Sequence, residues 1–329
     1  MRRIGLVAAA VLSQLACESG NEPPFPSTAF RSLRQVDVAG GGGSLDVSAD
    51  GRLLFVQTGG ATNTYVLPSD PSEGLPSPDV AVQGSGALRT HGDLLLLPLQ
   101  QNGLLVARTR DDGRTFETVA TSSIPTSWVH VSDDRVVLSH AGSIALLDRD
   151  RALGSHTDLA DALLSFDMPM HRSPSQDVAL KGDVLFVASD AGTVALDLTD
   201  PAAPTELYTL GDWFSTELRL HGDLLFVSQG YDAGAYDLTD PLNPVPLAFL
   251  NGGMGLATHG DYLYTVDRSN LFIHDLTGAV PTPVRYLNMV DEYDRDISHL
   301  GDCGDVAVPA QGIVASCAGN LHWLAPNEP

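Results

Sequence analysis

The chain has few basic residues. Lysine and arginine together number 18 of 329 residues, against 41 aspartates and glutamates, so the formal net charge is -23; Lys181 is the single lysine. Such a surface repels phosphate backbones and anionic lipid head groups, which argues against nucleic acid or a bare membrane as partner. Cations, basic proteins and neutral glycans remain as partners. Alternatively, the acidity only keeps an exported, monomeric protein soluble.

Long hydrophobic runs are also scarce. Residues Ile4–Leu12 follow Arg2 and Arg3 and are too few to span a bilayer, which is typical of a secretory signal peptide. The sequence Leu15-Ala16-Cys17 resembles the lipobox of bacterial lipoproteins, with Gln14 where that family usually has leucine. The resemblance implies removal of residues 1–16, lipidation of Cys17, and anchoring at the outer membrane or cell surface. Residues 17–32 are polar and proline-rich, so we expect a flexible tether there.

Cysteine is rare, with three in the chain. If Cys17 carries a lipid, Cys303 and Cys317 remain in an exported protein, where disulfides persist. Each of the two lies seven residues from Ala310, in the turn of a predicted hairpin, so they are expected to face each other across adjacent strands. We therefore expect a disulfide; the alternative is two free buried thiols.

Familiar catalytic motifs are absent from the sequence. There is no G-x-S-x-G elbow, no H-E-x-x-H pair and no glycine-rich phosphate loop. The run Gly40–Gly43 precedes no helix and therefore offers no helix dipole to a phosphate. These absences favour a non-catalytic binding protein without a cofactor. A hydrolase or lyase of the cell envelope is the alternative.

A repeat with a period near 40 residues dominates what is present. Gly-Asp pairs at Gly182, Gly222 and Gly260 each begin an apolar run and lie 40 and 38 residues apart; weaker copies begin near residues 51, 92, 134 and 312. Each complete unit holds four short strand signals. In the fourth unit these are Gln176–Leu180, Val184–Ala188, Thr193–Leu198 and Glu206–Leu210. The pattern predicts an all-β protein, a seven-bladed β-propeller of four-stranded antiparallel blades over residues 33–326. The catalytic alternative is therefore a propeller-type hydrolase or lyase, because propeller active sites draw single residues from many blades.

The two ends of the chain are predicted to share one blade. The seventh unit ends one strand short, while Leu33–Val38 alternates apolar and polar residues before the first complete unit. We expect Leu33–Val38 to pair as the outer strand of the last blade, because closure removes an exposed edge.

Two resemblances refine this picture. The pattern Gly-Asp-x-x-Phe-Val followed by Asp-Leu-Thr-Asp-Pro, at Gly182–Pro201 and Gly222–Pro241, resembles the LVIVD repeat of bacterial surface proteins. That resemblance covers roughly residues 175–280 well, and it implies a propeller and export but no defined activity. Residues Thr109–Phe116 resemble the Asp-box, which implies a structural hairpin between the third and fourth strands of a blade.

Carboxylates recur where the innermost strands begin. Aligning the repeats places Asp46, Asp177, Glu217 and Asp305 around the mouth of the central channel. Together they are weak candidates for a Ca²⁺ site, since this ion takes oxygen ligands. The favoured alternative is that each carboxylate accepts hydrogen bonds from backbone N–H groups of the neighbouring blade. The histidines His91, His221 and His259 lie on separate blades, too far apart for one metal ion, and we interpret them as polar turn residues.

The variable loops predict the binding face. Turns between first and second strands and between third and fourth strands repeat from blade to blade, whereas the loops on the opposite face differ. We expect a protein or glycan partner to dock on that variable face. The residues proposed to contact it are Trp213, Phe214, Tyr231, Asp232, Asp267 and Tyr293. The alternative is that Trp213 and Phe214 only cover the end of a blade.

Overall fold

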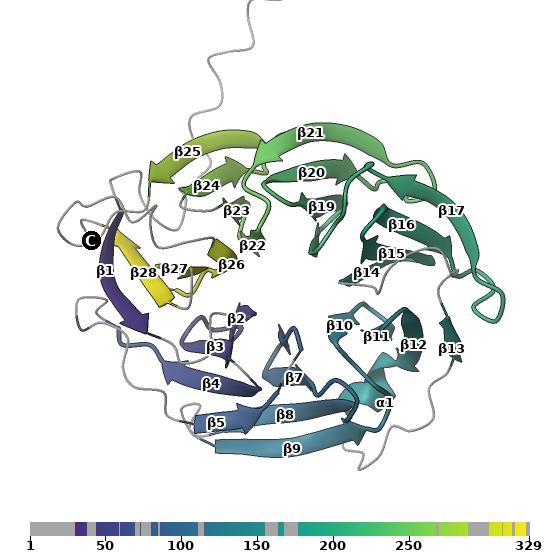
Figure 1. The fold of residues 1–329 in the computed structure, drawn as a ribbon, viewed down its shortest axis with the longest axis horizontal. Helices are drawn as coiled ribbons and strands as arrows, with labels where there is room; N and C mark the ends of the chain where they lie inside the picture. The colour runs from purple at the N-terminus through teal and green to yellow at the C-terminus, as the bar shows by residue number, and fades with distance from the viewer. Residues whose placement is uncertain are drawn as a thin grey trace, which may run out of the picture.

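Seven four-stranded antiparallel sheets stand around a central axis in the computed structural model (Figure 1). The structure describes residues 30–37, 44–58, 60–69, 73, 80–84, 86–110, 115–154, 164–167, 177–267, 270–288, 303–310, 312–317 and 320–326. The prediction of a seven-bladed β-propeller is confirmed. Blades are numbered here by the chain order of their innermost strands.

The strands follow one another from the axis outward in each blade. Blade 1 holds β2 (Leu45–Val47), β3 (Leu53–Thr58), β4 (Ala61–Val66) and β5 (Val80–Gln83); blade 2 holds β6 (Arg89–His91), β7 (Leu94–Pro98), β8 (Leu104–Arg110) and β9 (Thr115–Ser122); blade 3 holds β10 (Trp128–Val131), β11 (Arg135–His140), β12 (Ser143–Asp148) and β13 (Leu164–Asp167); blade 4 holds β14 (Val178–Lys181), β15 (Val184–Ser189), β16 (Gly192–Asp197) and β17 (Thr205–Leu210). Blade 5 holds β18 (Leu218–His221), β19 (Leu224–Gln229), β20 (Asp232–Asp237) and β21 (Val245–Asn251); blade 6 holds β22 (Gly255–His259), β23 (Tyr262–Val266), β24 (Asn270–Asp275) and β25 (Thr282–Asn288); blade 7 holds β26 (Cys303–Ala307), β27 (Ile313–Cys317), β28 (Asn320–Pro326) and β1 (Phe30–Asp37).

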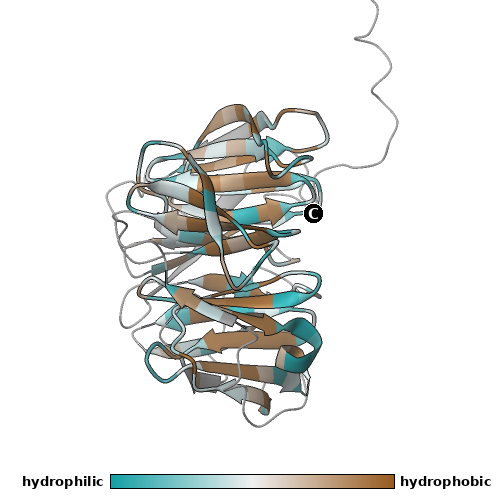
Figure 2. Ribbon diagram, turned by 90° about the vertical axis from the view of Figure 1, so that its right-hand side faces the viewer, coloured by the Kyte–Doolittle hydropathy of each residue, from teal (hydrophilic) through white to brown (hydrophobic). Residues whose placement is uncertain are grey.

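Packing between neighbouring blades forms the core. Seven hydrophobic clusters each join residues of two adjacent blades. Every residue of β15 is buried, since one face packs on blade 3 and the other on blade 5. This two-sided burial explains why the second strands are apolar without alternation. Seen from the side in Figure 2, the brown hydrophobic residues lie along the strands and much of the teal polar colour lies at their ends.

The last blade closes the ring as predicted. Strand β1 pairs antiparallel with β28, from Phe30 opposite Pro326 to Asp37 opposite Asn320. It begins at Phe30, three residues before the predicted domain boundary at residue 33. The predicted signal peptide, Cys17 and most of the predicted tether lie outside the described residues.

Helix is almost absent from the described part of the chain. The single helix there, α1 (Arg149–Leu153), has five residues and begins at the cap Asp148, whose carboxylate accepts a hydrogen bond from the Arg151 N–H. No helix among the described residues has the length and hydropathy needed to cross a bilayer.

Local turn chemistry separates the two faces of the ring. At Gly182 the φ angle is 58°, a left-handed conformation that glycine adopts without cost, in the turn from first to second strand. The Asp197 carboxylate accepts a hydrogen bond of 2.7 Å from the Thr199 N–H, which fixes the turn after the third strand. These repeated turns lie on one face, called here the turn face. The loops between blades and between second and third strands lie on the other, the variable face. The Asp-box-like residues 109–116 span the β8–β9 hairpin, between third and fourth strands as predicted, although residues 111–114 lie outside the described part.

Candidate functional site

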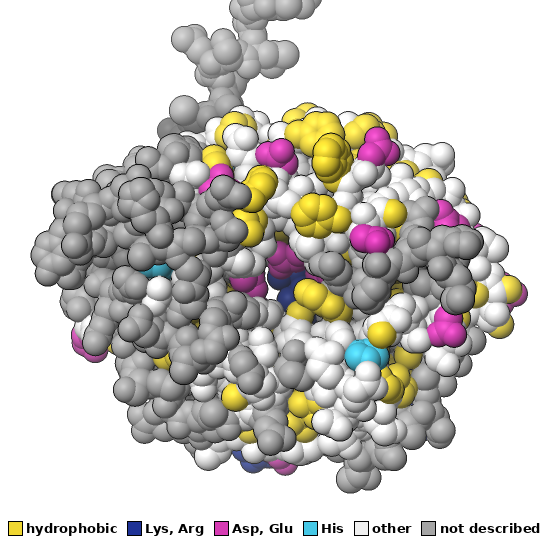
Figure 3. All heavy atoms as spheres, viewed as in Figure 1, with side chains coloured by type: hydrophobic (Ala, Val, Ile, Leu, Met, Phe, Trp, Pro, Cys, Tyr) yellow, Lys and Arg dark blue, Asp and Glu magenta, His cyan; other side chains and the backbone are white. Residues whose placement is uncertain are grey.

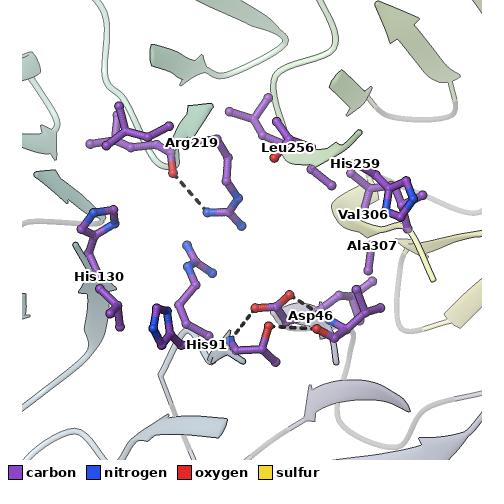
Figure 4. A pocket seen from close by; sticks show the side chains of 18 of the residues that line it. Asp46, His91, His130, Arg219, Leu256, His259, Val306 and Ala307 are labelled. Carbon is purple, nitrogen blue, oxygen red and sulfur yellow. Dashed lines mark hydrogen bonds between the residues drawn. The ribbon is translucent and has the colours of Figure 1, made fainter. Parts of the chain in front are cut away.

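Alternate residues of the innermost strands line the central channel. The middle layer of this channel takes one residue from each blade, the one that pairs with the central position of the second strand. In blade order the middle layer is Asp46, Arg89, His130, Ala179, Arg219, Ala257 and Ala307. Figure 4 shows Arg219, His130 and Asp46 around the space between the blades.

Each channel carboxylate joins its own blade to the next one. Asp177 Oδ2 accepts from the Leu218 N–H at 3.0 Å, and Glu217 Oε2 accepts from the Leu256 N–H at 3.0 Å. Asp305 Oδ2 accepts from the N–H of Leu45 at 2.7 Å, across the closure between blades 7 and 1. A carboxylate that accepts buried backbone N–H groups satisfies donors that would otherwise be costly. This geometry is the one we favoured over a metal site.

Asp46 makes the same kind of bond one layer deeper in the channel. Its Oδ2 accepts from the Thr90 N–H at 2.8 Å, which joins blade 1 to blade 2. The alignment grouped Asp46 with Asp177, but Asp46 pairs with Phe55, the equivalent of Phe186, and Phe186 pairs with Ala179. Asp46 therefore lies two residues further along its strand, and this part of the alignment was wrong. Among the described residues, no three His, Cys, Asp or Glu side chains are grouped so as to hold a metal ion.

Two arginines, which the sequence reasoning missed, reach this carboxylate cluster from blades 2 and 5. Arg89 Nη2 lies 3.0 Å from Asp177 Oδ2, and Arg219 Nη1 lies 3.6 Å from the same oxygen. Arg219 Nη2 also pairs with Glu217 Oε1. A repeated motif, Leu-Arg-x-His-Gly-Asp at residues 88–93 and 218–223, was the available signal for this pair.

Burial and like charge perturb the carboxylates. Four carboxylates face two guanidiniums, so the fully ionised cluster holds excess negative charge in a buried place. Burial is the largest cause that raises the pKa of Glu217 to about 8; the Arg219 charge opposes it and Asp305 adds to it. Burial likewise raises the pKa of Asp305 to about 6, against the opposing charge of Arg219. The cluster therefore takes up protons as the pH falls towards neutrality.

A cavity of about 260 Å³ lies in the channel on the side of the turn face. Its lining includes Arg89, Arg219 and His130. His91 and His259, the last residues of the innermost strands β6 and β22, line it at the turn face. Burial lowers the pKa of His130 to about 4, so its imidazole is neutral near pH 7. The predicted polar histidines His91 and His259 thus share this cavity, whereas His221 does not line it.

A second hollow, of about 840 Å³, lies on the variable face beside blades 5 and 6. The predicted residues Trp213, Phe214, Tyr231 and Asp232 all line it. Figure 3 shows hydrophobic side chains gathered over β20 and β21 at the top of the view, with acidic side chains beside them. Charged side chains are visible at the bottom of the central channel in the same view. We name the space lined by residues 213, 214, 216, 229–232, 249, 254 and 304 the aromatic hollow.

Four aromatic rings of the aromatic hollow are exposed to solvent. The exposed fractions are 71% for Trp213, 45% for Phe214, 51% for Tyr231 and 81% for Phe249. Phe214 packs close to Gly230, where a β-carbon would come within 3.2 Å of its ring. Trp213 is the more exposed of the two predicted cover residues, and Phe214 contacts its blade at Gly230.

The loop that carries Trp213 and Phe214 is held in place by the next residues. The Ser215 N–H donates to the Ser189 carbonyl at 2.7 Å, and Ser215 Oγ accepts from the Ser189 N–H at 3.1 Å. Thr216 Oγ1 lies 2.8 Å from Ser228 Oγ in blade 5. These bonds fix both neighbouring blades to the loop, so the aromatic rings stand on an ordered support.

The remaining predicted contacts lie elsewhere. Asp267 does not line the aromatic hollow; its Oδ1 accepts from the Asn270 N–H at 3.0 Å within the β23–β24 turn. Tyr293 lies outside the described residues. Phe249 and Met254 were missed, because an apolar residue on an outer strand does not reveal from sequence whether it is covered.

A Ser–His contact on the variable face bears on the hydrolase alternative. Ser127 Oγ lies 2.7 Å from His140 Nδ1 and donates to Gln100 Oε1 at 2.7 Å. His140 Nε2 lies 2.6 Å from Gln101 Nε2. In the tautomer in which Gln101 donates to Nε2, His140 Nδ1 donates to Ser127 and the contacts link blades 2 and 3; a general base for Ser127 needs the opposite tautomer.

The two downstream cysteines face each other across the β26–β27 pair. Cys303 and Cys317 are direct partners in the register, with a bulge between Cys303 and Asp305. The predicted register is therefore confirmed, and the disulfide itself stays a prediction.

Comparisons with known proteins agree with this architecture. The family model described as the LVIVD repeat matches residues 174–210, which contain all of blade 4. No curated protein matches the chain. The crystal structure of the Cps50 (Swd1) β-propeller domain of Myceliophteria thermophila is similar with a TM-score of 0.60; the match covers 90% of this chain and 99% of that chain, at 12% sequence identity. At that identity the likeness supports the fold alone, and the chain is a seven-bladed β-propeller that carries an LVIVD repeat.

Proposed function

We propose that this protein is a non-catalytic binding module that recognises a protein partner through the aromatic hollow. The observation that carries the proposal is the set of four aromatic rings, 45–81% exposed, gathered in one hollow on a fixed loop and strand framework. Exposed aromatic clusters of this kind mark interaction sites, and aromatic residues dominate contact energies. Because the loop that carries Trp213 and Phe214 is already held by hydrogen bonds at Ser215 and Thr216, binding costs little ordering entropy for that loop.

The composition of the hollow favours a protein over a glycan. The Phe249 side chain offers no hydrogen bond to sugar hydroxyls and the Met254 sulfur is only a weak acceptor, whereas a flexible Met side chain adapts well to apolar partners. Asp232 lines the same hollow, and the whole chain carries a net charge of -23. We therefore infer a partner segment that combines apolar side chains with basic residues.

The amino-terminal sequence supplies the cellular setting of the proposal. The lipobox-like Leu15-Ala16-Cys17 supports export and lipid anchoring at the outer membrane or cell surface. A tether after Cys17 would leave the propeller free to present its variable face to a partner.

Selection from a displayed random-peptide library against the purified full chain tests the partner class, with a neutral-glycan array in parallel. We expect peptides rich in arginine, lysine and apolar residues. Trp213→Ala and Phe249→Ala are each expected to weaken these peptides by about 2 kcal/mol, roughly 30-fold. Both side chains are exposed, so the melting temperature should change little.

Val284→Ala is the matched control, since Val284 is 55% exposed on β25 and does not line the aromatic hollow. Equal losses in Val284→Ala and Trp213→Ala would place binding elsewhere. If the protein captured only neutral glycans and Trp213→Ala abolished that capture, the aromatic hollow would still be the binding surface, but the proposal of a protein partner would be wrong.

A further inference from the structure

Every oxygen of the four channel carboxylates already accepts from a donor in the protein. Both oxygens of Asp46 accept backbone N–H groups, from Val47 and Thr90 at 2.8 Å each. The oxygens of Asp305 and of Asp177 each accept a backbone N–H as well. Glu217 Oε2 accepts a backbone N–H and Oε1 pairs with Arg219. The acceptors around the channel are therefore already engaged.

The two arginines, by contrast, have donors to spare. A guanidinium carries five N–H donors. Arg89 donates to the Leu88 carbonyl at 3.1 Å and to Asp177 at 3.0 Å. Arg219 donates to the Leu218 carbonyl at 3.1 Å and contacts Asp177 and Glu217. Neither has a further hydrogen bond among the described residues, although the charge of Asp305 also acts on both. Their side chains are 16% and 18% exposed, towards the channel.

The cavity on the turn-face side presents those donors. Arg89 and Arg219 line it, whereas Asp177, Glu217 and Asp305 lie behind them and do not. The middle layer has alanine in three blades, and this leaves a volume of about 260 Å³. One ordered water needs only about 10–15 Å³ by this measure, so the cavity has room for a small organic molecule. Asp46 also lines the cavity, with both carboxylate oxygens bonded to backbone N–H groups, and the rest of the surface combines apolar side chains with Thr and His.

We propose that this cavity binds a small oxyanion, a carboxylate or a phosphate, between Arg89 and Arg219. The guanidinium fork matches both groups in a two-point hydrogen bond. The apolar part of the lining suits a short hydrocarbon tail on a carboxylate. This site lies in the channel towards the turn face and is separate from the aromatic hollow. The proposal is therefore independent of the protein partner proposed for the aromatic hollow.

Calorimetric titration and thermal unfolding of the full chain at pH 7 test the proposal. Sodium acetate, sodium succinate and sodium phosphate are the probes, with ionic strength held constant by sodium chloride. We expect at least one oxyanion to bind and raise the melting temperature, as a ligand of the native state must. Binding of phosphate alone or of carboxylates alone identifies the source, and either result supports the site. No heat and no thermal shift with any of the three overturns it.

Variants assign the binding to the arginines. Arg89→Gln and Arg219→Gln should each weaken the bound probe at least tenfold, while Arg108→Gln, an exposed arginine paired with Asp93, should leave it unchanged. Ala257→Leu fills part of the cavity with every arginine contact intact, and should also weaken binding at least tenfold. This variant decides the matter if the arginine variants do not fold. Undiminished binding in Ala257→Leu, or in both folded arginine variants, would overturn the proposal.

Discussion

The raised pKa of Glu217 predicts that the propeller loses stability as the pH rises towards 8. The folded protein holds a proton on Glu217 up to about pH 8, whereas an unfolded chain releases it near 4.5. The folded state therefore binds more protons than the unfolded state between these values, and the free energy of unfolding must fall as the pH rises through this window. Glu217→Gln cannot titrate, so this part of the pH dependence should vanish.

The magnitude follows from the width of the pH window. Between pH 6.5 and 8, one proton bound only in the folded state lowers the free energy of unfolding by about 1.4 kcal/mol per pH unit, or about 2 kcal/mol in total. Asp305, with a pKa of about 6, titrates mainly below this range. Buried His130 and His274, whose pKa values are lowered to about 4, act with the opposite sign and only below about pH 6.5.

Urea unfolding of the full chain at pH 6.5, 7, 7.5 and 8 measures the effect. The urea concentration at the unfolding midpoint should fall steadily with pH for the wild type, and it should stay nearly constant for Glu217→Gln. Glu206→Gln, on the exposed strand β17, is the control and should follow the wild type. A wild type equally stable at pH 6.5 and 8, or a Glu217→Gln variant that declines as steeply as the wild type, would refute the reasoning.

Three further predictions concern the ring and the chain ends. Asp177→Ala removes the acceptor of the Leu218 N–H and leaves Arg89 without its carboxylate, and should lower the free energy of unfolding by about 3–5 kcal/mol in urea titrations. Mass spectrometry of unreduced peptides should find Cys303 joined to Cys317, and a loop of this size predicts a loss of about 3 kcal/mol in Cys303→Ser; two free thiols in the exported protein would contradict it. Cys17→Ser should abolish labelling by a fatty-acid analogue, and equal labelling of wild type and variant would show that Cys17 carries no lipid.

The blades were predictable because their determinants are local. A glycine with positive φ at Gly182 and a carboxylate at Asp197 that accepts from the Thr199 N–H each act over two or three residues. These signals repeat at intervals near 40 residues, so the strands between them could be inferred, and so could the pairing of the amino-terminal strand, described here as Phe30–Asp37, with the last blade. The opposing Cys303 and Cys317 followed from counting along one hairpin.

The sites were less predictable because they depend on where separate blades meet. Whether Phe249 is exposed depends on what lies beside an outer strand, and sequence periodicity does not carry that information. The misplacement of Asp46 has a simple origin. A slip of two residues keeps a strand residue on the same face, so only the pairing of Asp46 with Phe55 reveals its true layer.

In a ring of repeated blades, the position of a residue in the repeat alignment gives its height along the central axis. Residues at one aligned position lie in one layer, so departures within a layer show where the ring is specialised. Alanine occupies the middle layer in blades 4, 6 and 7, and a ring of seven long side chains would fill the channel. Arg89 and Arg219 stand at this position in blades 2 and 5, and both contact Asp177 of blade 4, Arg219 from the neighbouring blade and Arg89 from beyond blade 3. The alanines thus create the space and the arginines give it its charge, which is why the cavity follows from differences between repeats and not from the repeat itself.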